Sequence, residues 1–218
     1  QTLLPWMVRA GKKAILRILV DKGANPSIKD EGRGYTPLIV ALQHGNEAIV
    51  SLLIDKGANI DLKDDYGMSP IATAAREGKE AIARVLTDNN ASVNDKSRPH
   101  RQMPLLWAIA SGSEAIASLL LNAGADVNID SRECRGMSAL TCAVDAGHEA
   151  VVRLLLDHGA DVNATDVWAR TPLFLAAGGG DEAMTLLLLE RGASVSARDW
   201  DGVSPLDMAD RGGRDGLI

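Results

Sequence analysis

Residues 166–198 read DVWARTPLFLAAGGGDEAMTLLLLERGASVSAR, and this stretch decides the fold. It holds a Thr-Pro-Leu opening at 171–173, a turn at Gly180 and a closing Gly-Ala at 192–193. Threonine caps helices well and proline is tolerated at the first helical position, so we expect a short helix after the threonine. The apolar run at 184–189 is too continuous for a surface helix and predicts a second helix clamped between neighbours.

The same pattern recurs along the whole chain. A turn glycine ends each first helix at spacings of 33 to 35 residues, at Gly11, Gly45, Gly78, Gly112, Gly147, Gly180 and Gly213. A second mark follows the first six of these, always before an alanine, at Gly23, Gly57, Asn90, Gly124, Gly159 and Gly192. A period near 33 residues with two fixed marks is typical of a repeat array whose neighbouring units share one core.

The recurring sequence pattern resembles the ankyrin repeat. It includes Thr-Pro-Leu at 36–38 and 171–173, glycine turns, leucine-rich helices and Gly-Ala-Asp-Val-Asn at 124–128 and 159–163. The resemblance implies an all-α solenoid of stacked helix-turn-helix units with projecting β-hairpin fingers. It covers 1–218 as a single array, with approximate units 1–30, 31–63, 64–97, 98–132, 133–165, 166–198 and 199–218.

One family feature is missing from this sequence. The family's Thr-Pro-Leu-His wording has no histidine here, because its slot holds Pro5, Ile39, Ala72, Leu106, Thr141, Phe174 and Asp207. The hydrogen bonds that this histidine supplies must be replaced or lost, so we expect a looser network in the loops.

Composition excludes several classes of function. The net charge of −6 argues against nucleic-acid binding, which needs a basic surface. Two cysteines without a framework pattern indicate a reducing, intracellular compartment, cytoplasmic or nuclear. No apolar run approaches the roughly 18 residues of a membrane span. The chain begins and ends inside a repeat, so we expect a piece of a longer protein. We also expect a monomer that holds neither a metal nor a cofactor.

Irregular segments are the better functional leads. The stretches 90–103 and 124–138 are one and two residues longer than the shortest equivalents. They carry basic candidates for contacts to an acidic partner, namely Arg98, His100, Arg101 and Arg135. The alternative is that both segments are tolerated surface insertions.

Aromatic residues are rare in this chain, at 3% of the composition, yet several fall at the expected finger tips. Tyrosine and tryptophan are enriched at binding hot spots, which makes Tyr66, Trp168 and Trp200 candidate anchors. Arg170, beside Trp168, is a further candidate contact. The alternative is that each ring lies over the neighbouring finger, which we expect above all for Tyr35.

The C-terminal ends of the first helices are expected to line a concave groove. Arg76 and Asp145 are candidate contacts there. A local hollow is expected where the groove residues are small, near Ala110, Ser111, Gly178 and Gly179. A remote alternative is an enzyme or small-molecule binder that uses this hollow.

Four other residues attract attention. Trp107 is expected to pack in the core or between repeats, and Cys142 to be a small buried residue. Asn128 and Asn163 stand at the family position that asparaginyl hydroxylases modify. The alternative that we favour is that each asparagine bonds the turn backbone.

The sequence therefore predicts a non-catalytic scaffold that binds another protein or an extended peptide, acidic in the favoured case, through finger tips and groove. An alternative is a sensor, regulatory or substrate-recruiting domain of a larger multidomain protein. We expect neither nucleic acid nor membrane as a partner.

Overall fold

The computed structural model describes residues 3–94, 103–131 and 136–215. Helices alternate between two rows across these ranges. The first helices are α1 (Leu3–Arg9), α3 (Pro37–Gln43), α5 (Pro70–Arg76), α7 (Pro104–Ala110), α9 (Ala139–Asp145), α11 (Pro172–Gly179) and α13 (Pro205–Asp215). The second helices are α2 (Lys13–Asp21), α4 (Glu47–Asp55), α6 (Glu80–Asp88), α8 (Glu114–Asn122), α10 (Glu149–Asp157) and α12 (Glu182–Glu190).

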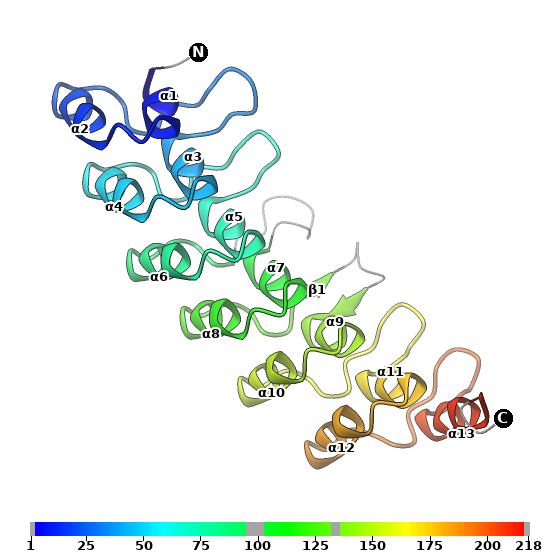
Figure 1. The fold of residues 1–218 in the computed structure, drawn as a ribbon. Helices are drawn as coiled ribbons and strands as arrows, with labels where there is room; N and C mark the ends of the chain where they lie inside the picture. Colours follow the sequence, from blue (N-terminus) through cyan, green and yellow to red (C-terminus); the bar gives the residue numbers. More distant parts are fainter. Residues whose placement is uncertain (1–2, 95–102, 132–135, 216–218) are drawn as a thin grey trace.

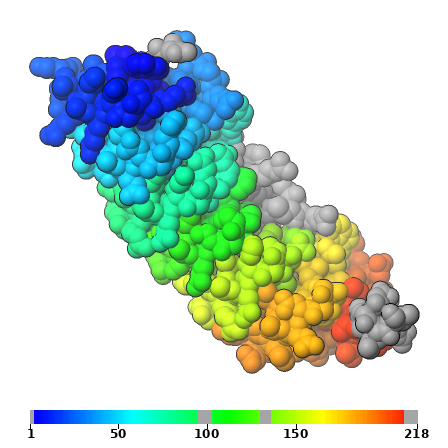
Figure 2. Space-filling model, in the orientation of Figure 1, coloured from blue at the N-terminus to red at the C-terminus, as the bar shows by residue number. Residues whose placement is uncertain are grey.

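The helix pairs stack into one elongated array (Figures 1 and 2). The row of first helices lies between the row of second helices and a row of projecting loops (Figure 1). Each first helix packs against the next one, from α1 to α13. We number the connecting loops as fingers 1 to 6, at 22–36, 56–69, 89–103, 123–138, 158–171 and 191–204. This arrangement is the all-α solenoid that the sequence predicts.

Side-chain caps start most of the first helices. Thr36 Oγ1 accepts a hydrogen bond from the backbone N–H of Ile39, and Thr171 Oγ1 does the same for Phe174. Such caps satisfy donors that the first helical turn leaves unpaired. The helix starts predicted from Thr-Pro-Leu are therefore confirmed.

The core is aliphatic and continuous from one repeat to the next. In α12, Met184, Leu187 and Leu188 are buried, whereas Leu186 and Leu189 are exposed. The prediction that the whole run is clamped between neighbours is therefore wrong, because one face of this second helix remains at the surface.

The fingers are mostly irregular turns. Within the described ranges, strand pairing is confined to finger 4, where β1 (Asp130–Ser131) pairs antiparallel with β2 (Met137–Ser138). The tip slot held by Gly34 has a positive φ of 65°, and the same slot in finger 5 holds Ala169 at 61°. Asn90 also has a positive φ, of 60°, as its helix-ending position predicts.

Aspartates hold the finger turns together. Asp64 Oδ1 accepts the N–H groups of Tyr66 and Met68 in finger 2. Asp166 and Asp199 make the equivalent pairs of bonds in fingers 5 and 6. The missing histidine predicts fewer loop bonds, but these turns are tied by a carboxylate instead.

A second set of bonds links one finger to the next. At five successive junctions a side-chain oxygen accepts a backbone N–H from the following repeat. Asn128 Oδ1 accepts from Asp161 at 3.0 Å, and Asn163 Oδ1 accepts from Ser194 at 2.8 Å. Both asparagines therefore bond the backbone, as the favoured alternative predicts, but the backbone belongs to the following repeat and not to their own turn. They connect neighbouring repeats, which makes them part of the stacking.

Candidate functional site

The tips of fingers 5 and 6 bring two candidate anchors together. The backbone N–H of Trp200 donates to the carbonyl of Trp168 at 3.1 Å. The Trp200 residue is 76% exposed and Trp168 is 40% exposed. Trp200 therefore projects into solvent, contrary to the alternative that its ring is covered by a neighbouring finger.

Arg170 explains the partial cover of Trp168. Its guanidinium carbon lies 4.5 Å from the centre of the Trp168 ring, which is a cation–π contact. The same guanidinium is bound to the buried carboxylate of Asp166, with Nε at 2.8 Å and an NH2 contact at 2.6 Å. Arg170 therefore stacks on the Trp168 ring, while the Asp166 carboxylate neutralises its positive charge.

An open hollow of about 330 Å³ lies between these two fingers. We call it the tryptophan cleft, lined by Trp168, Arg170, Phe174, Asp199, Trp200 and Asp201. Three of these residues are aromatic, in a chain with few aromatic residues. The cleft thus combines apolar ring faces with acidic side chains at one place on the finger row.

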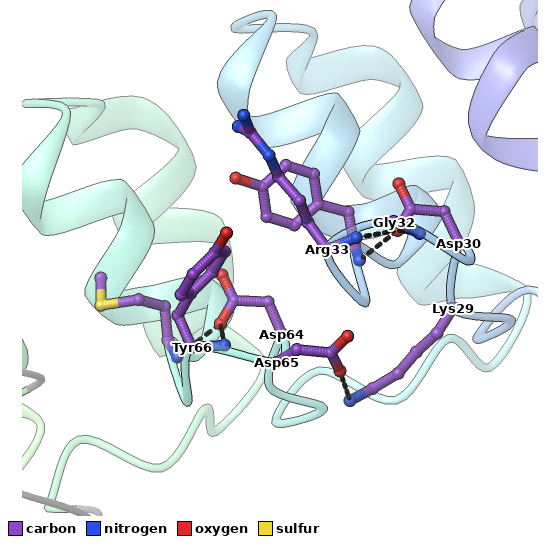
Figure 3. Close-up of polar contacts among 9 residues, drawn as sticks. Lys29, Asp30, Gly32, Arg33, Asp64, Asp65 and Tyr66 are labelled. Carbon is purple, nitrogen blue, oxygen red and sulfur yellow. Dashed lines mark hydrogen bonds and ion pairs between the residues drawn. The ribbon is translucent and has the colours of Figure 1, made fainter.

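Tyr66 occupies the tip of finger 2 and is exposed. Figure 3 shows it beside finger 1, on the turn that Asp64 holds. Finger 1 is joined to finger 2 by an ion pair between Lys29 Nζ and Asp65, at 3.3 Å. Tyr66 is therefore available as an anchor on a turn of defined shape.

Tyr35 behaves differently from these exposed aromatic residues. It is half-buried and packs against the core, with the Arg33 guanidinium 5.9 Å from its ring centre. Hydrogen bonding to Tyr35 raises the pKa of Arg33. Because this ring covers the core, we do not count it among the anchors.

Asp30 organises finger 1 electrostatically. Its Oδ1 accepts the N–H groups of Arg33 and Tyr35, both at 3.0 Å, and that of Gly32 at 3.3 Å (Figure 3). Partial burial raises the pKa of this carboxyl, but the backbone donors outweigh it and the pKa is lowered below 3.8. The charged form of Asp30 is the form that holds the turn.

The two candidates in the groove stand on different units. Arg76, at the end of α5, is exposed, contacts Glu77 at 3.4 Å and lies 5.9 Å from the Trp107 ring centre. Asp145, at the end of α9, is also exposed. Trp107 is half-buried against the core, as predicted, and its Nε1 is buried without a hydrogen-bond partner among the described residues.

A shallow hollow does occur at the C-terminal end of the first-helix row. It has a volume of about 380 Å³ and is lined by Ala177, Gly178, Gly179, Gly180, Glu182, Thr185 and Ala209. Ala110 and Ser111, expected beside it, do not line it. Cys142 is half-buried rather than buried.

Comparison with known proteins decides the family. The family model for ankyrin repeats in three copies matches residues 4–97 and 95–166, and the single ankyrin repeat model matches 169–200. The chain belongs to the ankyrin repeat family. Proteins of this family are in general protein–protein interaction modules without catalytic activity of their own.

Solved ankyrin domains have the same architecture. The ankyrin repeat domain of Bcl-3, described as a unique member of the IkappaB protein family, is 27% identical with a TM-score of 0.84. That match covers 96% of this chain and 94% of the other. The human ASB11 ankyrin repeat domain is 24% identical with a TM-score of 0.77, covering 96% and 92%. A comparison with curated protein sequences found no match.

Four candidates on this ankyrin array lie outside the described residues. They are Arg98, His100, Arg101 and Arg135. Across residues 3–94, 103–131 and 136–215, every helix is too short or too polar for a transmembrane span. The same ranges contain no group of three histidine, cysteine or acidic side chains arranged for a metal ion.

Asp199, Asp201 and Phe174 line the tryptophan cleft, although they are not among the contact residues expected from the sequence. Asp199 and Asp201 flank Trp200 in the chain, and Phe174 belongs to α11. The alignment of the repeats is the sequence signal that could have revealed this cleft. It aligns Trp200 with Asp65 and Trp168 with Tyr66, and so places both tryptophans on adjacent tips of the ankyrin stack.

Proposed function

We propose that this ankyrin array is a non-catalytic scaffold that binds another protein, or an extended peptide, through its finger tips and concave groove. The observation that carries the proposal is the tryptophan cleft, which two exposed tryptophan residues line together. Burying an exposed tryptophan against a partner contributes more than most contacts, because its large rigid ring loses little entropy.

The finger row offers enough room for such a partner. Adjacent repeats stack at roughly 8–10 Å, so six fingers extend over about 50 Å. An interface of standard size needs roughly 800 Å² from each partner. Tyr66 near one end of the row and Trp168 with Trp200 near the other would then act as separate anchors on one partner.

The central fingers complete the proposal. Arg98, Arg101 and Arg135 fall on fingers 3 and 4 and would steer an acidic segment of the partner. Charges at the rim of an interface mainly accelerate association, so their effect would weaken as salt is added. We place the protein inside the cell, since its two cysteines show no disulfide framework.

Affinity capture from native extract tests the proposal. The wild-type chain is compared with Trp168→Ala/Trp200→Ala, with Arg101→Glu, and with Leu186→Ala as a control. Leu186 is an exposed apolar residue on α12, in the other row of helices. A partner lost with the double tryptophan variant and kept by the control supports recognition by the fingers. A partner kept by every variant would overturn recognition by the finger tips.

A further inference from the structure

We propose that the tryptophan cleft receives an arginine side chain of the partner protein. The proposal deepens the proposed function and depends on it, since it names the chemistry that one end of the finger row recognises. It is carried by the charges, ring faces and size of the cleft.

The charge of the cleft selects a cation. Arg170 is already balanced, because the Asp166 carboxylate beneath it binds its guanidinium. The other charged residues of the lining are Asp199 and Asp201, which are both acidic. Arg198 does not line the cleft, and its guanidinium binds the carbonyl of Gly202 instead. An incoming carboxylate would meet two like charges, whereas an incoming cation would be attracted by both.

The ring faces select a flat cation. Arg170 already stacks on Trp168 at 4.5 Å, which shows that a guanidinium fits against an indole in this setting. Trp200, on the other side of the cleft, is 76% exposed. Its backbone N–H is bonded to the carbonyl of Trp168, which places the Trp200 residue at the same cleft while its side chain remains in solvent.

Arginine suits this combination better than lysine. A guanidinium is planar, stacks on aromatic faces and binds a carboxylate through two parallel N–H groups. An ammonium is compact and more strongly hydrated, so it gives up more solvation on entering. The volume of about 330 Å³ is at the low end of ligand pockets, which matches one long side chain.

Direct binding of a defined probe tests the proposal. The probe is a short glycine peptide with one central arginine, and the controls replace the arginine by citrulline, lysine or glutamate. Citrulline keeps the shape of arginine but has no charge. Two-dimensional NMR of the indole N–H groups reports on Trp168 and Trp200, with Trp6 as an exposed tryptophan at the far end of the array.

We expect the arginine peptide to shift the Trp168 and Trp200 signals saturably, and to leave Trp6 unchanged. Trp200→Ala should weaken binding by roughly 3–10-fold, in line with one cation–π contact at a partly exposed site. Asp201→Asn should weaken it by about 2–5-fold, and more so at low salt. Trp6→Ala serves as the matched control and should leave binding unchanged.

Three results would overturn the proposal. They are equal shifts with the citrulline peptide, equal or tighter binding of the lysine peptide, and unchanged affinity in Trp200→Ala. The proposed function fails separately, because it depends on capture of a partner by the finger row. If the tryptophan variant loses the partner while the arginine peptide does not bind, the scaffold stands and the arginine assignment falls.

Discussion

The N–H of Trp200 is bonded to the carbonyl of Trp168, and the same bond recurs at the other end of the array between Asp65 and Arg33. Asp65 and Trp200 occupy equivalent positions in the repeat, and each donates to a residue at the tip of the preceding finger. The bond therefore belongs to the geometry of stacked repeats rather than to tryptophan itself. The side chains at these positions decide the surface chemistry, acidic and basic in fingers 1 and 2 and aromatic in fingers 5 and 6.

Removing the Trp200 ring should change stability very little. Trp200→Ala is expected to lower the free energy of unfolding by less than about 1 kcal/mol, because the ring is mostly in solvent. Leu155→Ala or Leu187→Ala should cost about 2–5 kcal/mol, because each leaves a cavity in the core. Chemical denaturation compares the variants. Equal losses for Trp200 and Leu187 would show that the ring is structural.

Exchanging alanine and glycine at the tip position that Gly34 and Ala169 share should change stability in opposite directions. Ala169→Gly is expected to stabilise the protein by up to about 1 kcal/mol, because alanine at a φ of 61° is strained. Gly34→Ala should destabilise it by about 1–2 kcal/mol, since φ is 65° and a Cβ would lie 2.1 Å from Asp65 Oδ1. Thermal unfolding of both variants checks the pair, and a loss of stability in Ala169→Gly would contradict the assigned strain.

The bonds between repeats depend on an acceptor, not on an amide. Asn128→Ala should cost about 1 kcal/mol, because the N–H of Asp161 loses its partner. Asn128→Asp should be tolerated better, since Asp61 accepts the N–H of Ser92 in the same way at an earlier junction. Amide hydrogen exchange at residue 161 measures the bond directly. Unchanged protection in Asn128→Ala would refute the role.

Asp30 should make finger 1 sensitive to acid. Its pKa in the folded protein is lowered below 3.8, so its contribution is complete above about pH 4 and is lost as the pH falls through the folded pKa. The advantage of wild type over Asp30→Asn in thermal stability should therefore shrink below about pH 4. NMR titration of the Asp30 carboxyl carbon checks the pKa, and a value above 3.8 would contradict this account.

The repeat pattern determined the fold because it is local. Thr171 before Pro172 starts a helix through a bond to a residue three positions away, and Gly180 ends that helix in a left-handed conformation. Asn90 replaces a glycine at a position that requires a positive φ. Each of these effects acts within one turn of the chain, so a single sequence predicts it reliably.

The tertiary structure decided what the stacking of units brings together. Arg170 is neutralised by Asp166 and stacked on Trp168, and Asp199 and Asp201 lie beside that ring in the next finger. Asn128 turns to the following repeat instead of its own turn. These relationships depend on how one finger is placed over another, which is set by helix packing rather than by neighbours in the chain. The sequence by itself determined an ankyrin array with aromatic tips, and only the stacked structure made two of those tips into an acidic, aromatic cleft.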